Sequence, residues 1–558
     1  MTIKKISAFT FGVLIALALT AYLNRIYLLT NMTGWLTDIK HPRETNHPVP
    51  WIVGPTAASL PPNERPPNII VIMADDMGIN DVTTYGGGYA GSGAPTPSID
   101  SIATDGVRFD AGYAASAVCT VSRAALMTGR YSSRFGVNFT PTPGNMLKML
   151  PLLIKGDDRL LPIVTHEDKV KELKEFNELG MPPSEITVAE LLKERGYHTM
   201  HLGKWHLGGT KELRPNNQGF DESLYMESGL YLPENSPDVV NSKQDFDPID
   251  GFLWPNMRFA VSYNNGTWFE PNKYLTDYLT DEAVSAIRSN KNRPFFMYLA
   301  HWGVHTPLQA KKEDYDALSN LKDHRRRVYA AMVRSIDRSV GKILQALKEE
   351  GLDENTIVIF TSDNGAPNYI GLPEVNQPYR GWKLTFFEGG LRVPYVAKWP
   401  GHIAAGTHYK TPVSNIDILP TVVAAAGGKL PPDRVIDGVS LLPFLGVSDA
   451  RDKPIQAARP LYWNDGSYQA IQFEGWKMQV SELPKKIWLF NLNEDPTERV
   501  NLADKRKDKI ADLKAMLAAH NARLPPSLWP SILESPIAID KTLDQKPALT
   551  DEYIYWQN

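Results

Sequence analysis

Three unbroken apolar runs that end in polar residues constrain the fold of this chain more than any other feature. They read NIIVIMADDMG at 68–78, RPFFMYLAHWGVHTP at 293–307 and NTIVIFTSDNG at 355–365. Runs of this kind predict strands that are buried on both faces. Between the last two runs, apolar residues at helical spacing predict a long helix closed by Gly351, namely Val328, Met332, Ile336, Val340, Ile343 and Leu347. Strand, helix and strand in this order predict a parallel, layered α/β domain with functional groups at the carboxyl ends of its strands.

The chain has 558 residues, which is enough for one large domain and a smaller one. Short aromatic-rich segments after about residue 455 predict a small antiparallel sheet, and a helix with Ile510, Leu513, Met516 and Leu517 on one face follows. Prolines at 47–67 predict a semi-rigid spacer. We therefore expect a signal or anchor at 1–24, a proline-rich linker at 25–67, a catalytic domain at 68–455, a C-terminal subdomain at 456–525 and a tail at 526–558.

The N-terminal segment has the features of an export signal. Lys4 and Lys5 precede a mostly apolar run at 6–23, and Ala16 and Ala18 offer a small-residue cleavage site. The length of the run lies between a signal-peptide core and a spanning helix, so a cleaved signal and an uncleaved membrane anchor both remain open. A single cysteine in an exported chain is typical of a bacterial periplasmic or secreted protein. We expect the chain to be exported, with membrane contact only through this segment.

The charge of the chain argues against a nucleic-acid partner. Lys and Arg number 59 and Asp and Glu number 63, which leaves a net charge of -4. No long run of either sign stands out, whereas nucleic-acid-binding proteins concentrate basic residues. The chemistry must therefore be sought in the polar residues that follow the predicted strands.

Two pairs of polar residues at strand ends predict a metal site. Asp75 and Asp76 follow the first run, and they can reach one point only if the chain turns there, as Gly78 permits. Asp363 and Asn364 repeat the arrangement after the third run. Each pair alone could equally be a solvated turn or a helix cap, but together they form an all-oxygen cluster. Such a cluster suits Ca²⁺ or Mg²⁺ better than zinc.

Two further segments predict an anion site. In HLGKWHLGG at 201–209, Lys204 and His206 alternate with apolar residues, so in an extended chain both polar tips point to one side. Lys383 lies among aromatic residues and glycines, where a cation binds an anion strongly. The alternatives are structural or solvated side chains.

Cys119 is the single cysteine of the chain. A phosphate-binding cysteine loop needs an arginine six positions on, where this chain has Ala125, and Arg123 comes two positions too early. The local signature of a papain-like dyad is also missing. A buried structural cysteine remains the simple alternative.

The segment around Cys119 resembles the sulfatase signature Cys-x-Pro-Ser-Arg followed by Thr-Gly-Arg, since it reads CTVSRAALMTGR at 119–130. Other segments resemble sulfatase segments in sulfatase order over most of 68–505: DDMG, TPSIDSIATDGVRFDAGYA, GKWHLG, QGFDE, FFMYLAHWGVHTP, TSDNGA, GWKLTFFEGGLRVP and LFNLNEDPTERVNLAD. The chain is thus similar to the formylglycine-dependent, arylsulfatase-like members of the alkaline phosphatase superfamily. The resemblance implies an alkaline-phosphatase-like α/β/α sandwich with a smaller C-terminal domain of antiparallel sheet plus helix.

The resemblance also implies roles for individual residues. A maturation enzyme, either formylglycine-generating or anaerobic, would oxidise Cys119 to Cα-formylglycine. The hydrate of that group would be the nucleophile, with a covalent sulfate ester as intermediate, and Arg123 would orient it. One Ca²⁺ would be bound by Asp75, Asp76, Cys119, Asp363 and Asn364. Lys204, His206, His305 and Lys383 would surround the sulfate, with His305 or Lys383 as the general acid.

One position departs from the sulfatase pattern. The third residue of the signature is normally proline and sometimes alanine, whereas here it is Val121. The maturing enzyme must read this segment in extended form, and valine is comfortable in an extended chain. We expect reduced efficiency of maturation rather than failure.

Three functions are compatible with these observations. The leading one is an exported hydrolase that cleaves sulfate from an aryl or carbohydrate sulfate ester, whether small or polymeric. The second is a phosphonate monoester hydrolase or phosphodiesterase of the same superfamily, because tetrahedral phosphoryl and sulfuryl groups suit the same site. The third is a silent, sulfatase-like binding protein in which Cys119 stays a thiol. The stretches 142–185 and 226–271 are expected to shape the substrate pocket.

Overall fold

The computed structural model describes the chain except for residues 1–18, 62–63, 88–93, 143–160, 228 and 446–458. Most of the expected signal or anchor, part of the expected pocket stretch at 142–185 and the expected boundary near residue 455 therefore lie outside the described residues. Within the described ranges, no helix is both long enough and apolar enough to cross a bilayer.

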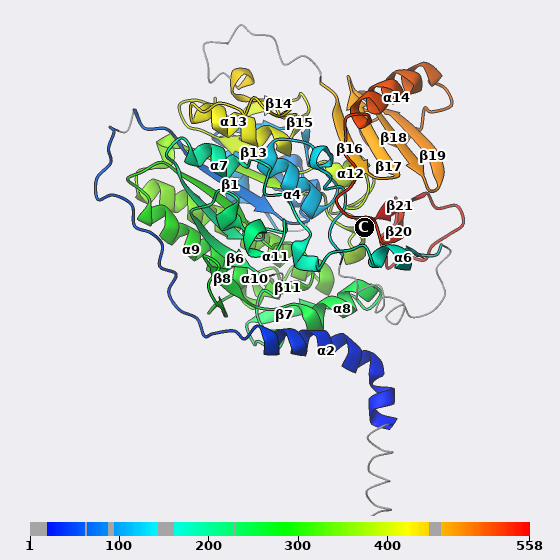
Figure 1. The fold of residues 1–558 in the computed structure, drawn as a ribbon, viewed down its shortest axis with the longest axis horizontal. Helices are drawn as coiled ribbons and strands as arrows, with labels where there is room; N and C mark the ends of the chain where they lie inside the picture. The colour runs from blue at the N-terminus through cyan, green and yellow to red at the C-terminus, as the bar shows by residue number, and fades with distance from the viewer. Residues whose placement is uncertain (1–18, 62–63, 88–93, 143–160, 228, 446–458) are drawn as a thin grey trace, which may run out of the picture.

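A ten-stranded mixed sheet forms the centre of the molecule (Figure 1). Its five central strands run parallel, and strands that are mostly antiparallel to their neighbours complete both edges. In spatial order the strands are β14 (Thr407–Tyr409), β2 (Val107–Phe109), β13 (Tyr395–Lys398), β12 (Thr356–Ser362), β1 (Asn68–Ala74), β10 (Phe295–Ala300), β5 (His198–Gly203), β6 (Glu222–Met226), β8 (Val261–Tyr263) and β9 (Trp268–Phe269).

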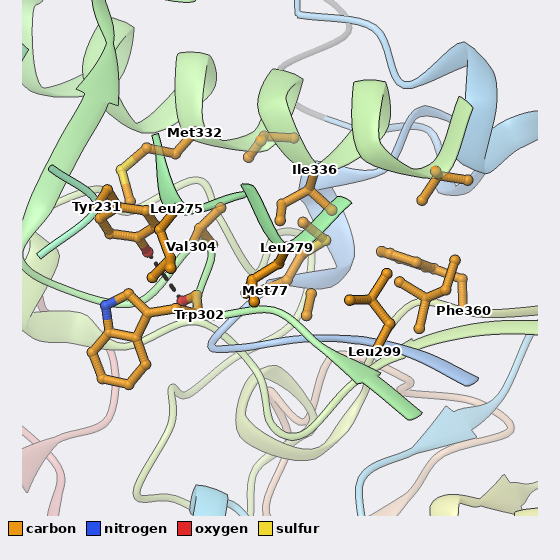
Figure 2. Close-up of a cluster of buried hydrophobic side chains, with 14 of the residues drawn as sticks. Met77, Tyr231, Leu275, Leu279, Leu299, Trp302, Val304, Met332, Ile336 and Phe360 are labelled. Atoms are coloured by element: carbon orange, nitrogen blue, oxygen red, sulfur yellow. Dashed lines mark hydrogen bonds between the residues drawn. The ribbon is translucent and has the colours of Figure 1, made fainter. Parts of the chain in front are cut away.

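Helices cover both faces of this sheet. Strand β1 shows why its sequence is apolar throughout, because Ile70 and Ile72 pack into one core and Ile69 and Val71 into the other. The first core, seen in Figure 2, includes residues of α3 (Pro97–Thr104), α9 (Leu275–Ser289) and α11 (His324–Glu349). The second includes residues of α4 (Cys119–Thr128), α7 (Val188–Lys193) and α13 (Ile418–Ala425). The predicted α/β/α sandwich is confirmed. The predicted long helix is also confirmed, and it ends just before Gly351, whose φ is 65°.

A four-stranded antiparallel sheet follows the main sheet in the sequence (Figure 1). It contains β16 (Leu461–Asp465), β17 (Tyr468–Phe473), β18 (Trp476–Glu482) and β19 (Lys485–Asn491). The helix α14 (Lys507–Asn521) packs on one face through Ile510, Leu513 and Leu517. The predicted combination of a small sheet and a helix is confirmed.

The remaining elements are short, except for α2 (Arg25–Lys40). The expected tail contributes β20 (Leu533–Ala538) and β21 (Tyr553–Gln557), which form a small sheet with β4 (Val164–Thr165). Two strand pairs join β3 (Gly112–Tyr113) to β15 (Val413–Ser414) and β7 (Val239–Ser242) to β11 (Leu308–Lys311). The other α-helices in the described part of the chain are α2 (Arg25–Lys40), α6 (Glu167–Val170), α8 (Pro248–Asn256), α10 (Lys312–Ala317) and α12 (Glu388–Leu391).

A buried charged group joins the C-terminal sheet to the main domain. Lys477 on β18 has no exposed surface, and its Nζ lies 2.8 Å from Glu388 Oε1 and 3.0 Å from Glu498 Oε1. Glu388, at the start of α12, also pairs with Arg392 at 2.8 Å. Because a buried charge needs a partner, these contacts hold the two parts of the protein in one arrangement.

The structure differs from the expected linker at 25–67. Residues 25–40 form α2, because the prolines of this region begin only at Pro42. The following segment is extended but is held to the main domain: the Trp51 indole donates to Glu282 Oε2 at 2.8 Å, and the Ile52 N–H donates to Glu222 Oε1 at 2.8 Å. The region therefore lies against the body of the protein and is not a free spacer.

Candidate active site

The carboxyl ends of four neighbouring strands meet in one place. In the order β12, β1, β10 and β5, these strands lead into the residues predicted from the sequence: Asp363 and Asn364, Asp75 and Asp76, His305, and Lys204 and His206. The helix α4 adds Cys119 and Arg123, and the loop after β12 adds Lys383. The structure thus brings all the predicted site residues together at one edge of the sheet, where parallel α/β sheets place their sites.

The acidic pair after β1 turns at its second residue. Asp76 has a φ of 62°, so the chain enters the left-handed region there, before Gly78. Its backbone N–H donates to Asp363 Oδ1 at 3.2 Å, and Asn364 Nδ2 donates to its Oδ1 at 2.8 Å. The expected turn is real, but Asp76 makes it instead of Gly78.

Three buried cations face the three buried carboxylates. Arg123 Nε and Nη2 lie 2.9 and 2.8 Å from Asp363 Oδ2. Lys204 Nζ lies 2.6 Å from Asp75 Oδ2, and Lys383 Nζ lies 2.7 Å from Asp76 Oδ1. Each of these side chains is at most 8% exposed, so the pairs are shielded from water.

Arg123 differs in its contacts from the expected role of orienting residue 119. Besides Asp363, its guanidinium lies 3.5 Å from Asp75 and 3.3 Å from the Tyr298 hydroxyl. The nearby carboxylate of Asp363 raises the pKa of Arg123 against the effect of burial, so the side chain stays charged. Arg123 therefore holds two carboxylates in position.

The thiol of Cys119 lies against the acidic pair. Its Sγ is 3.4 Å from Asp75 Oδ1 and 3.7 Å from Asp76 Oδ1. Cys119 begins α4 and is 3% exposed, so the N-terminal end of the helix points into the site. Burial, followed by the charge of Asp363, raises the pKa of the Cys119 thiol well above its usual value. At this position an unmodified thiol stays protonated and is a poor nucleophile.

The two histidines occupy the rim of the site as neutral rings. Burial lowers the pKa of His305 to about 3, and it lowers the pKa of His206 well below the usual value. His305 Nδ1 donates to the Thr306 carbonyl at 2.6 Å, because a carbonyl can only accept, and this leaves Nε2 as an acceptor 3.6 Å from Asp76 Oδ2.

The segment that carries Lys204 and His206 is not an extended strand, as the sequence led us to expect. The strand β5 ends at Gly203, and His206 has a φ of 62°. Its Nδ1 is buried and finds no hydrogen-bond partner within the described residues. The left-handed turn, rather than strand alternation, sets the direction of this side chain.

The cluster fits an oxygen-liganded cation. Potential ligand atoms of Asp75, Asp76, Cys119 and His305 lie within 4.8 Å of one another. The Oδ1 atom of Asn364 is buried and makes no hydrogen bond among the described residues. Carboxylate and amide oxygens are ligands that Ca²⁺ accepts, so the oxygen atoms of Asp75, Asp76 and Asn364 fit such an ion.

Sequence reasoning missed three aromatic residues at the site. The Tyr369 hydroxyl donates to Asp76 Oδ2 at 3.3 Å, and the Tyr298 hydroxyl accepts from Arg123. The Trp302 ring packs against that of His305 at a tilt of 32°, with centroids 4.2 Å apart, and its centroid lies 4.7 Å from Lys204 Nζ. Trp302 belongs to a segment that was singled out, but nothing in the sequence marked Tyr369. His301, in the same segment as Trp302, forms a hydrogen bond with Ser339 Oγ at 2.8 Å.

Comparisons with known proteins identify the family of the chain. The family model Sulfatase matches residues 67–428, and the model N-sulphoglucosamine sulphohydrolase, C-terminal matches residues 381–523. The chain is 35% identical to N-acetylgalactosamine-6-sulfatase of Rattus norvegicus over 78% of this chain and 74% of that protein. It is 30% identical to steryl-sulfatase of Mus musculus over 90% of this chain and 88% of that protein.

A solved structure agrees as well. The crystal structure of Ps i-CgsB in complex with k-i-k-neocarrahexaose superposes with a TM-score of 0.68 at 31% identity, covering 83% of this chain and 95% of that chain. The fold, the site and the extent of these matches lead to one conclusion. The chain is a member of the sulfatase family, the enzymes that hydrolyse sulfate esters.

Proposed function

We propose that this protein is an exported sulfatase that removes sulfate from a sulfated carbohydrate. The proposed reaction uses Cα-formylglycine formed from Cys119 by a maturation enzyme, together with one Ca²⁺. The observation that carries the proposal is the position of Cys119 Sγ, which lies 3.4 Å from Asp75 inside a ring of buried cations. The names of two similar proteins, N-acetylgalactosamine-6-sulfatase and a complex with k-i-k-neocarrahexaose, support a carbohydrate substrate.

A bound dication would change the charge of the site. The carboxylates of Asp75, Asp76 and Asp363 are matched by the three cations that face them, so these groups are balanced without a metal. Ca²⁺ bound by Asp75, Asp76, Asp363, Asn364 and residue 119 would give the site a positive charge that suits the sulfuryl oxygens. The Oδ1 atom of Asn364 is a possible metal ligand in this set that accepts no hydrogen bond from the described residues.

The surroundings of residue 119 suit a hydroxyl-bearing group better than a thiol. The hydrate of formylglycine would supply one hydroxyl that attacks sulfur and displaces the substrate alcohol. Deprotonation of the second hydroxyl would re-form the aldehyde and expel the sulfate. The Asp75 carboxylate, 3.4 Å from Sγ, is placed to accept a proton from a hydroxyl at residue 119. Arg123 acts as a positioning residue, because it fixes Asp75 and Asp363.

The remaining polar side chains suit the sulfate and the leaving oxygen. Lys204 and Lys383 bring positive charge, and well-placed donors of this kind contribute roughly 3 to 4 kcal/mol each. In the tautomer fixed by Thr306, neutral His305 has no proton on Nε2. We therefore assign the proton donated to the leaving oxygen to Lys383, and to His305 and His206 the binding of substrate hydroxyl and sulfuryl groups.

Substrate comparison tests the proposal. The matured protein is assayed with an aryl sulfate, an aryl phosphonate monoester, and galactose and N-acetylgalactosamine oligosaccharides that carry sulfate. The expected result is that sulfate is released from a sulfated oligosaccharide faster than phosphonate is turned over. Faster phosphonate hydrolysis would favour the phosphonate monoester hydrolase instead. If residue 119 is converted and none of the sulfate esters releases sulfate, the proposal is contradicted.

A further inference from the structure

The helix α2 carries an apolar face that points away from the protein. The face consists of Leu28, Met32, Trp35, Leu36 and Ile39, which we name the outer face of α2. These residues are three or four positions apart, so they share one side of the helix. All of them are exposed, with Trp35 at 49% and Ile39 at 76%. An exposed apolar surface of this kind marks a contact site.

The opposite side of α2 is fixed to the body of the protein. Gly34 is buried against α8 so closely that an added Cβ would meet the Pro255 carbonyl oxygen at 2.3 Å. The guanidinium of Arg258 donates to Asp38 at 3.0 Å, which ties the end of the helix to the main domain. Figure 1 shows α2 lying along α8 at one edge of the molecule. The direction of the outer face is therefore set by the fold.

The surroundings of the outer face identify what covers it. The apolar run at 6–23 ends two residues before α2 begins at Arg25, so a bilayer that takes up this run lies within one helical turn of α2. Tyr22 and Tyr27 are exposed near this junction, and Trp35 lies on the outer face itself. Aromatic residues of this type concentrate at the membrane–water interface.

The charges of α2 complement an anionic bilayer. Arg25 and Lys40 are exposed at its two ends, and Lys4 and Lys5 precede the apolar run. Asp38 is the one acidic residue in the sequence of this helix, and it faces the protein, where it pairs with Arg43 and Arg258. Exposed apolar, aromatic and basic side chains all occur in helices that lie in the headgroup region of a membrane.

We infer that the outer face of α2 lies in the surface of an anionic phospholipid bilayer and holds the enzyme there in a fixed orientation. The segment after α2 is bound to the main domain through Trp51 and Ile52, so it gives the enzyme little freedom to swing away. The inference concerns a surface remote from the sulfatase site and does not depend on the proposed substrate.

Site-specific probes on the full chain test this inference. Met32→Cys and Ile39→Cys variants are labelled with the polarity-sensitive dye NBD, because the native Cys119 is buried and does not compete. Labelled protein is mixed with vesicles of phosphatidylethanolamine and phosphatidylglycerol. The expected result is a shift of NBD emission to shorter wavelength and quenching by nitroxide-bearing lipids. The control is Val435→Cys, whose exposed side chain is remote from α2 in the sequence and is expected to show neither effect.

Two outcomes would overturn the inference. In the first, the protein floats with the vesicles while the probes at positions 32 and 39 behave like the probe at position 435. In the second, the probes shift without vesicles and in proportion to protein concentration, which would assign the outer face to a second copy of the chain.

A charge variant separates α2 from the rest of the N-terminus. Trp35→Glu with Leu36→Glu in the labelled Ile39→Cys chain is expected to abolish the emission shift, whereas the exposed Leu549→Glu in the same chain is expected to preserve it. Hydrolysis of a small soluble aryl sulfate is expected to stay unchanged in both, so a failure here is distinguishable from a failure of the proposed function. Persistence of the shift in the double-glutamate variant would overturn the inference.

Discussion

The Sγ atom of Cys119 lies 3.4 Å from the Oδ1 atom of Asp75, with both side chains buried. The unmodified thiol does not account for this close contact, because a protonated thiol makes only a weak hydrogen bond to a carboxylate. A hydroxyl at residue 119 would make a much stronger hydrogen bond to the same oxygen. Four predictions test this reading of the site and of its surroundings.

Conversion of Cys119 is the first prediction. We expect the peptide that contains residue 119, isolated from the native host, to have lost sulfur and two hydrogens and gained one oxygen, as mass spectrometry can measure. Cys119→Ala is expected to reduce kcat by about 10³-fold or more, because it removes the nucleophile. An unmodified thiol in protein that is fully active would contradict the proposed chemistry.

Replacement of Val121 is the second prediction. Val121 lies in the first turn of α4, is 4% exposed and packs in the same core as Tyr113 and Phe386. Proline is tolerated in the first helical turn, so Val121→Pro is expected to fold. Because proline is usual at this position of the signature, we expect a larger converted fraction by mass spectrometry and a proportional rise in activity. Val121→Gly serves as the control, since it shortens the side chain without adding the proline ring. An unchanged converted fraction would show that Val121 does not limit maturation.

Calcium dependence is the third prediction. Chelation followed by dialysis is expected to abolish sulfate release, and added Ca²⁺ is expected to restore it. Asn364→Leu removes an oxygen that has no other partner within the described residues, so the Ca²⁺ concentration for half-maximal activity should rise about tenfold, or about 1.4 kcal/mol. Asn493→Leu, at an exposed asparagine after β19, is the matched control. Equal Ca²⁺ dependence in both variants would remove Asn364 from the ligand set.

The fourth prediction concerns stability and pH. Burial raises the pKa of Asp81 from 3.8 to about 8, although Tyr329 and the Gly78 N–H donate to its Oδ2. Between these values the folded protein binds a proton that the unfolded chain has lost, so the free energy of unfolding falls as pH rises, by at most about 1.4 kcal/mol per pH unit. The stability is complete below about pH 4 and is lost as pH rises through 8.

Thermal unfolding at several pH values measures this contribution. Asp81→Asn keeps the shape of the side chain but does not titrate. The midpoint temperature of unfolding of this variant is therefore expected to change less between about pH 5 and about pH 9 than that of the native chain. Asp353→Asn, in the turn before β12, is the control. Equal pH slopes in the native chain and the Asp81 variant would mean that Asp81 is charged throughout.

The sequence was sufficient for the parts of the fold that depend on burial. Strand β1 could be predicted because residues on both sides of it are apolar, and α11 because its apolar residues recur at helical spacing. The site could be predicted because its polar residues directly follow such strands. The C-terminal sheet was recognisable from aromatic-rich segments and turns.

The rest depends on contacts between distant residues. A left-handed φ, as at Asp76 and His206, is uncommon for residues other than glycine, so the local sequence pointed to Gly78 as the turn residue and to an extended segment at 204–206. The side-chain partners of Arg123 lie on or directly after three different strands, and Tyr369 reaches Asp76 from a loop without a motif. The helix α2 was hidden because residues 25–40 were grouped with the prolines that follow.

The ion pair between Lys477 and Glu388 has a consequence for engineering and for evolution. Glu388 comes five residues after Lys383, which is one of the cations of the site. An ion pair with Lys477 of the C-terminal sheet therefore holds the segment that carries Lys383 in place. Truncation of the chain before β18 would leave the buried carboxylate of Glu388 without its lysine. The main domain and the C-terminal sheet therefore depend on each other, and chimaeras of such enzymes should be joined outside 383–498.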